Sequence, residues 1–209
     1  MKQLVIVGAG EFGRELYWTI QGSKDYGIDF EIKGFIDDDD SEEKISKLSA
    51  PFLGKINDYV IDQDDVFTCA IANPTPREIV INRMLEKNAE FINIIHSSSI
   101  IHGTAKLGQG IIVSPFSSIG DASVIGDYFV LNGLSCIGHD CVMGDYTCVM
   151  SHCDITGHTH IGKKVFIGGG ARTVPEAKIE DEAYVGAGSV ILRKVKAGKK
   201  VFGNPAKEI

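Results

Sequence analysis

The chain has 209 residues, of which 44% are hydrophobic and 23% charged, as is typical of a globular protein. Its formal net charge of −7 argues against non-specific nucleic-acid binding, which requires a basic surface. No segment approaches the roughly 20 consecutive apolar residues of a membrane span, and the N-terminal apolar run passes into a glycine motif instead of a signal-peptide cleavage site.

The N-terminal residues alternate between strand-like and helix-like patterns. An apolar, β-branched stretch is followed by a glycine motif, and helical spacing then begins at Glu11. The expected strands cover residues 2–7, 31–36 and 66–72, and the expected helices cover residues 11–21 and 76–88. Such alternation predicts a small parallel sheet, so we assign residues 1–95 to a Rossmann-like domain.

The glycine motif has the strand–GxGxxG–helix context in which phosphates meet a helix N-terminus. The domain is too short for a second βαβαβ half, so a mononucleotide or nucleotide-sugar ligand is favoured over NAD. A tight turn without a ligand stays open as the alternative. The candidate substrate ligands here are Gly8, Gly10, Gly13, Asp37, Asp38 and Asn73. Arg77, at the start of the second helix, is expected to meet a phosphate or to lie on the surface.

From Ile101 to Lys196 the chain divides into 16 consecutive six-residue units. The first position is Ile, Leu, Val or Met in all but one unit, the second is often Gly, and the fifth is mainly small. This period fits short strands joined by turns, with glycine or asparagine serving the turns. Three units close an 18-residue coil, which predicts a β-helix of about five coils over residues 96–209, with residues 18 apart stacked.

The repeat separates the histidines by their position. His139 lies at a turn, and Gly157 is expected to stack on it one coil later, leaving a gap for a thioester and an amide to stabilise its oxygen. A histidine is a suitable base near neutral pH, and Asp140 is placed to orient it. A surface His–Asp pair without function is the alternative.

No metal is expected. Asp140 and His158 are 18 residues apart and form a possible ligand pair, but the histidines lack the spacing of the β-helix enzymes that hold a metal with three histidines. The five cysteines form no CxxC pair, and Cys141 and Cys153 occupy small-residue positions of the repeat. Reduced thiols with packing roles fit this arrangement, and we expect a cytoplasmic protein.

Several motifs in order carry a resemblance to a known family. They are GAGEFGRE, GFIDDD, LNG followed by IGHDC, FIGGGARTV, YVGAGSVI and VFGNPAKEI. The chain resembles the hexapeptide-repeat sugar acetyltransferases of the sialic acid O-acetyltransferase and UDP-4-amino-sugar N-acetyltransferase type. The resemblance implies a left-handed parallel β-helix, a homotrimer, and acetyl-CoA as co-substrate.

The resemblance also implies site residues. His139 matches the general base and Asp140 the supporting acid, while Asn132 matches a residue of the acceptor site. Coenzyme A is expected between neighbouring subunits beside positions matching Gly157, Gly169 and Ala187, and a uridine nucleotide on the glycine loop and Asp37. Two positions depart from the family pattern: Cys148 replaces a frequent second histidine, and Phe12 replaces a frequent glycine or histidine.

The sequence therefore predicts an acetyl-CoA-dependent acetyltransferase that acts on an amino or hydroxyl group of a sugar, with nucleotide-linked amino sugars as the favoured substrates. Cys148 is included among the acceptor-site candidates, although packing explains it equally well. The alternatives are a sialic acid O-acetyltransferase and a non-catalytic nucleotide-sugar-binding or regulatory protein.

Overall fold

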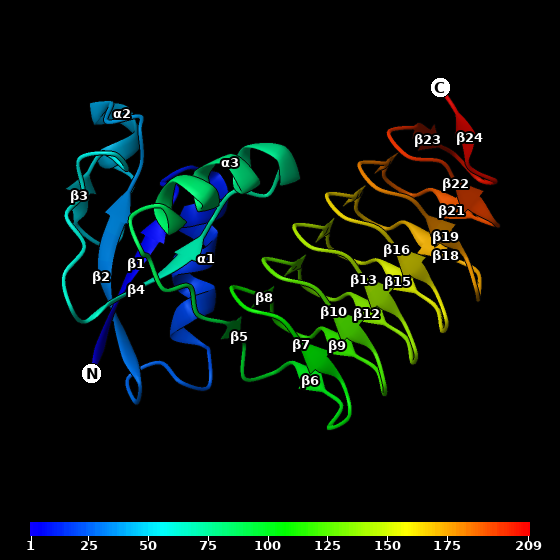
Figure 1. Ribbon diagram of the computed structural model, residues 1–209, viewed down its shortest axis with the longest axis horizontal. Helices are drawn as coiled ribbons and strands as arrows, with labels where there is room; N and C mark the ends of the chain where they lie inside the picture. The colour runs from blue at the N-terminus through cyan, green and yellow to red at the C-terminus, as the bar shows by residue number, and fades with distance from the viewer. The chain divides into compact units, whose positions relative to one another are not determined.

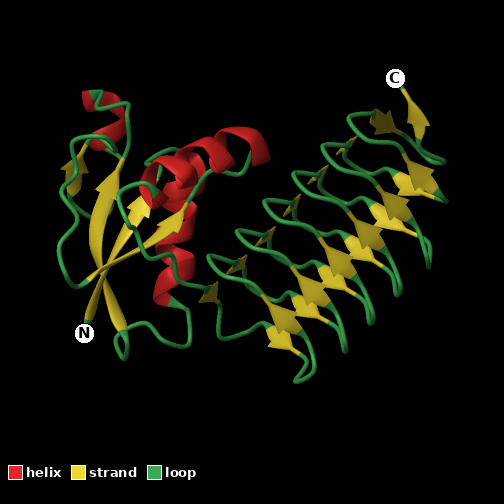
Figure 2. Ribbon diagram, viewed as in Figure 1, coloured by secondary structure: helices red, strands yellow, loops and turns green.

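The computed structural model describes all 209 residues and divides the chain into two compact units, Met1–Ser97 and Ser98–Ile209. Figures 1 and 2 show a sheet with helices in the first unit and a stack of short strands in the second. None of the helices has the length and apolarity needed to cross a membrane.

The first unit is built on a parallel sheet with strand order β3-β2-β1-β4, which confirms the predicted small parallel sheet. The strands of this sheet are β1 (Lys2–Val7), β2 (Phe30–Ile36), β3 (Phe52–Gly54) and β4 (Asp65–Cys69), and the unit also contains β5 (Ile94–Ile95), which lies outside this sheet. Its helices are α1 (Glu11–Gln21), α2 (Glu42–Ile45) and α3 (Pro74–Leu85). The sequence patterns did not predict β3 and α2, which are too short to show a period.

The centre of this sheet forms the core of the first unit. The last four residues of β1, from Leu4 to Val7, are completely buried. It pairs with β2 on one side and β4 on the other, so both its edges are hydrogen-bonded. Such a buried central strand is expected to be an unbroken apolar run, as it is here.

The second unit is a parallel β-solenoid with three sheets (Figure 1). Two sheets have the orders β22-β19-β16-β13-β10-β7 and β21-β18-β15-β12-β9-β6, and the third runs β24-β23-β20-β17-β14-β11-β8. All strands have two residues except β23: β6 (Ile100–Ile101), β7 (Lys106–Leu107), β8 (Ile112–Val113), β9 (Ser118–Ile119), β10 (Val124–Ile125), β11 (Val130–Leu131), β12 (Cys136–Ile137), β13 (Val142–Met143), β14 (Cys148–Val149), β15 (Asp154–Ile155), β16 (His160–Ile161), β17 (Phe166–Ile167), β18 (Arg172–Thr173), β19 (Lys178–Ile179), β20 (Tyr184–Val185), β21 (Val190–Ile191), β22 (Lys194–Val195), β23 (Lys200–Phe202) and β24 (Lys207–Glu208).

Pairing at 18-residue intervals follows the predicted repeat over most of the solenoid. Ile137 of β12 pairs with Ile119 below it and Ile155 above it, and all three are buried. The last coil differs, because Lys194 pairs with Lys178 across 16 residues instead of 18. The final predicted unit, residues 191–196, is therefore not a full repeat. With six strands on each of two faces, the expected five coils are only an approximation.

Glycine in the repeat has a different role from the one expected. The left-handed backbone falls on the fourth position, where Asp140 has φ 54° and His158 has φ 58°. The second-position glycines instead make room for the next coil: a Cβ on Gly138 would lie 2.7 Å from the Gly157 nitrogen. Close coil-to-coil approach, and not turn conformation, thus selects glycine at this position.

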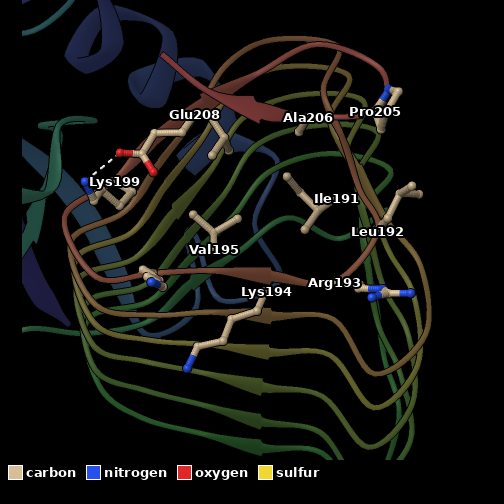
Figure 3. A pocket seen from close by; sticks show the side chains of 11 residues that line it. Ile191, Leu192, Arg193, Lys194, Val195, Lys199, Pro205, Ala206 and Glu208 are labelled. Carbon is tan, nitrogen blue, oxygen red and sulfur yellow. Dashed lines mark hydrogen bonds and ion pairs between the residues drawn. The ribbon is translucent and has the colours of Figure 1, made fainter.

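The C-terminal end of the solenoid carries a cavity of about 480 Å³ (Figure 3). Strand β24 runs antiparallel to β23 there, and Lys199 forms an ion pair with Glu208. Arg193, Lys194 and Lys196 also line the cavity. This end of an otherwise acidic chain is therefore rich in basic side chains.

Candidate active site

The centre of the candidate site is the turn between β12 and β13, which carries His139 and Asp140. The His139 Nδ1 and Asp140 Oδ2 atoms are 2.8 Å apart, a hydrogen-bonding distance. The hydrogen bond with His139 lowers the pKa of the Asp140 carboxyl below its ordinary value. Asp140 is therefore ionised at neutral pH, and when Nδ1 donates to it the imidazole has its lone pair at Nε2.

Gly157 stacks on His139, as predicted from the repeat. A Cβ built on Gly157 would lie 2.6 Å from the His139 Nε2 atom, so the ring occupies the space of the missing side chain. The adjoining backbone is fixed, since the His158 N–H donates to the His139 carbonyl oxygen at 3.0 Å. The imidazole itself therefore fills the gap expected above His139, and it is held against a bare stretch of backbone with its Nε2 atom beside Gly157.

His158 is the nearest ionisable neighbour of this pair. Its Nε2 atom is 4.0 Å from Asp140 Oδ2, and its ring meets the His139 ring edge-on with centroids 5.0 Å apart. All three side chains are about half exposed. The predicted stacking of Asp140 and His158 is therefore present, and one carboxylate oxygen faces both histidines.

Asn132 and Cys148 converge on a residue that sequence reasoning missed. Asn132 Nδ2 lies 3.3 Å from the Met150 sulfur, and Cys148 Sγ lies 3.9 Å from the same sulfur. Cys148 is fully buried, which supports packing over a nucleophilic thiol. Met150 occupies the second position of its repeat unit, where glycine is usual, and that departure was the available signal.

The other buried cysteines of the solenoid have structural contacts. Cys141 Sγ lies 3.3 Å from the Thr156 carbonyl oxygen, and Cys153 Sγ lies 3.2 Å from that of Gly168. Burial raises the pKa of the Cys153 thiol to about 11. Such a thiol stays protonated at neutral pH and is a poor nucleophile.

The three expected coenzyme A positions do not lie together within one chain. Gly157 belongs to the stacked turns 138–141, 156–159 and 174–177, which we call the His139 corner. Gly169 and Ala187 belong to the stacked turns 150–153, 168–171 and 186–189, which we call the Gly169 corner. The sheet of β12, β15 and β18 separates the two corners.

The glycine loop of the first unit has the geometry of a phosphate loop. A Cβ on Gly13 would lie 2.1 Å from the Gly8 carbonyl oxygen, so only glycine permits this approach of helix and loop. Gly10 is the N-cap of α1, and a Cβ there would meet nothing within 4 Å. A cavity of about 220 Å³ adjoins Gly10 and is lined by Arg14, Lys44 and other residues.

The two predicted acidic ligands already have protein partners. Asp37 Oδ2 accepts the Ala9 N–H at 2.7 Å, which ties the end of β2 to the glycine loop. Asp38 forms an ion pair with Arg83 at 2.7 Å, and this hydrogen bond lowers the pKa of the Asp38 carboxyl. The hydrogen bond of Asp37 is consistent with a role in shaping the glycine loop. Asp38 would have to break its ion pair with Arg83 before it could bind a ligand.

Asn73 and Arg77 both shape the start of α3. Asn73 is the N-cap, and its side chain accepts the Thr75 N–H at 3.3 Å. Arg77 is only 1% exposed, and its Nη1 donates to the carbonyl oxygens of Ile71 and Ala72. Neither expectation for Arg77 fits these contacts, because the guanidinium is buried and stabilises the chain that leaves β4.

Three comparisons with known proteins bear on this site. Residues 3–84 match the family described as the PglD N-terminal domain. The chain is 33% identical to a GDP-perosamine N-acetyltransferase of Escherichia coli O157:H7, over 98% of this chain and 95% of the relative. It therefore belongs to the sugar acetyltransferase family of that relative, which confirms the predicted family.

Two solved structures have the same fold. The acetyltransferase domain of PglB from Neisseria gonorrhoeae, in complex with acetyl coenzyme A, matches with a TM-score of 0.88 and 25% identity, covering 100% of this chain and 99% of that one. PerB from Caulobacter crescentus, in complex with CoA and GDP-perosamine, matches with a TM-score of 0.89 and 23% identity, covering 100% and 98%.

Proposed function

We propose that the protein transfers an acetyl group from acetyl-CoA to the amino group of a nucleotide-linked amino sugar. The observation that carries the proposal is the His139–Asp140 pair held against the glycine position of the next coil. Membership of the sugar acetyltransferase family supports the reaction class, and the named activity of the E. coli relative supports an amine acceptor.

In the proposed mechanism, His139 Nε2 accepts a proton from the acceptor amine as the nitrogen attacks the thioester carbonyl carbon. Asp140 holds the ring with its proton at Nδ1 and stabilises the imidazolium that forms. His139 then returns the proton to the sulfur as the carbon–sulfur bond breaks. An amide and a free thiol result, and the base regains its starting state.

The Gly157 N–H is proposed as the donor to the carbonyl oxygen as negative charge develops. At another corner of the solenoid, the backbone N–H at the equivalent repeat position donates a hydrogen bond to an aspartate side chain one coil later. Gln109 N–H donates to Asp127 at 2.9 Å, and Lys163 N–H donates to Asp181 at 2.8 Å. The residue one coil after Gly157 is Pro175, which has no side-chain acceptor. No aspartate side chain therefore lies at the equivalent position one coil after Gly157.

The basic C-terminal end supports an orientation for the donor. Arg193 lies between β21 and β22, on the continuation of the His139 corner. Three coil steps separate His139 from this level, or about 14 Å at the usual strand spacing. We propose that the acyl end of acetyl-CoA lies at His139 and that Arg193 meets the phosphates of its nucleotide half (Figure 3).

We assign nucleotide binding to residues 1–95, as a Rossmann-like domain, and acyl transfer to residues 96–209, as a left-handed β-helix. Gly8, Gly10 and Gly13 would receive a phosphate at the start of α1, with Arg14 in the adjoining cavity. Asn132 and Cys148 remain candidates for the acceptor pocket beside Met150.

A homotrimer is proposed because one chain separates the expected donor positions. Gly157 lies on the His139 corner, whereas Gly169 and Ala187 lie on the Gly169 corner. A groove lined by both sets requires the His139 corner of one subunit to face the Gly169 corner of its neighbour. Three such grooves close a ring with threefold symmetry.

The test is thiol release from acetyl-CoA with a panel of UDP-, GDP-, TDP- and CMP-linked sugars. Each sugar is tested in two forms, one with an amino group and one with a hydroxyl group at the same carbon. We expect turnover with at least one amino sugar and none with its hydroxyl counterpart. Turnover of hydroxyl sugars alone would contradict N-acetylation. Tight nucleotide-sugar binding without thiol release would contradict catalysis.

A further inference from the structure

His139, Asp140 and His158 offer three metal-ligating groups from two stacked turns. One ligand atom from each residue lies within 4.8 Å of the other two. Asp140 Oδ2 is the shared point, at 2.8 Å from His139 Nδ1 and 4.0 Å from His158 Nε2. Two imidazoles and a carboxylate form a donor set that zinc accepts.

The spacing of these atoms is close to that of a tetrahedral site. Ligand atoms at the usual zinc distances of about 2.0–2.2 Å lie about 3.3–3.6 Å from one another. The widest separation here exceeds that range by little more than 1 Å, and all three side chains are exposed. The backbone beneath them is fixed by the hydrogen bond between His158 and His139.

We infer that Zn²⁺ binds His139, Asp140 and His158 and reversibly inhibits the proposed acetyl transfer. Zinc bound at His139 Nδ1 leaves the neutral ring with its proton on Nε2. The nitrogen that must accept the acceptor's proton then has no lone pair, and Asp140 is withdrawn from its orienting role. The inference rests on the proposed function for its inhibitory part, whereas metal binding itself is independent of that function.

His158 is the residue that distinguishes this site from the catalytic pair, because the proposed reaction does not use it. The substitution His158→Asn removes a strong ligand and suits the positive φ of this turn, since asparagine tolerates left-handed backbone. The matched control is His102→Asn, which makes the same change at an exposed residue two coils before the His139 pair and away from the proposed donor groove. Cys136 is exposed, so all variants carry Cys136→Ser to remove a competing thiol.

Zinc binding is measured by calorimetry on the full chain, with Co²⁺ absorption spectra as a second readout of coordination. Acetyl transfer is followed by the loss of thioester absorbance, so no thiol reagent competes for the metal. We expect one Zn²⁺ per chain, an inhibition constant equal to the calorimetric Kd, and reversal by a chelator. Mg²⁺ is expected to have no effect, because it prefers oxygen ligands in octahedral geometry.

His158→Asn is expected to weaken both zinc binding and inhibition at least about tenfold, since even outer-shell partners contribute 10–100-fold to metal affinity. Its uninhibited kcat should equal that of the His102→Asn control, which keeps full zinc sensitivity. Unchanged zinc affinity in His158→Asn would overturn the inference. A chain that binds zinc through His158 but acetylates no sugar would uphold the metal site and refute the proposed function.

Discussion

Gly157→Ala gives the sharpest test of how the glycine position supports the base. The added methyl carbon would start 2.6 Å from His139 Nε2, and ordinary contact begins at 3.4 Å, so the ring must withdraw by 3.4 − 2.6 = 0.8 Å. A displacement of about 1 Å in a reacting group can reduce the rate about 10²-fold. We therefore expect kcat to fall about 10²-fold, which corresponds to about 2.7 kcal/mol in the barrier.

The fold should tolerate this change. The His139 side chain is 60% exposed and can turn toward solvent, so we expect the free energy of unfolding to change by less than about 0.5 kcal/mol. Gly103→Ala is the matched control, because Gly103 holds the same repeat position on the same corner and a Cβ there meets nothing within 4 Å. Its kcat should equal that of the wild type.

The assay compares initial rates of thiol release at saturating acceptor and donor, alongside urea unfolding of each variant. Wild-type kcat in a folded Gly157→Ala protein would refute the reasoning, because the base would then not need its position beside the bare backbone. An equal loss in Gly103→Ala would also refute it, since the effect would not be specific to His139.

Asp140→Asn should lower kcat at least about 10-fold and by up to about 10⁴-fold, the loss seen when a triad histidine loses the acid that sets its tautomer, with KM for acetyl-CoA unchanged. Unchanged kcat would contradict an orienting role. Arg193→Ala should raise KM for acetyl-CoA and leave kcat and KM for the acceptor unchanged; the reverse pattern would contradict the donor orientation. Asp65→Asn should destabilise the first unit by about 2–3 kcal/mol in urea unfolding, since buried Asp65 accepts hydrogen bonds from Lys33 and Tyr59 at 2.8 and 2.7 Å, while the exposed Asp62→Asn should not. Burial alone would raise the pKa of the Asp65 carboxyl, but its hydrogen bonds lower it below the ordinary value. The free energy of unfolding of the wild type should therefore decrease as the pH falls below the unfolded-state pKa of about 3.9 toward the lower folded-state pKa. Asp65→Asn should lack this decrease.

The six-residue period was strong enough to predict the solenoid and the pairing of residues 18 apart. It also predicted the stacking of Gly157 on His139. Because the first residue of each unit must face the core, the third and fourth residues of that unit must lie in the turn. The period could not predict the shortened last coil, because Ile191 still holds the apolar first position of the last unit, and Val195 takes the next core position only four residues later.

Side-chain partners in the first unit were the least predictable part. The burial of Arg77 depends on the carbonyl groups that the chain presents after β4, and a local pattern does not contain that information. The pairing of Asp38 with Arg83 joins residues 45 apart in sequence. Likewise, Met150 was overlooked because its contact with Asn132 arises only when two coils are stacked.

The central claim is that His139 is the base of an acetyl transfer, and the most direct measurement is kcat for His139→Ala with an accepted nucleotide-linked amino sugar. We predict a fall of at least about 10², the smaller end of the range for a general base, with unchanged Kd for acetyl-CoA. A rate that recovers as the pH is raised, where more of the acceptor amine is unprotonated, would add support. Wild-type kcat at neutral pH in this variant would contradict the account.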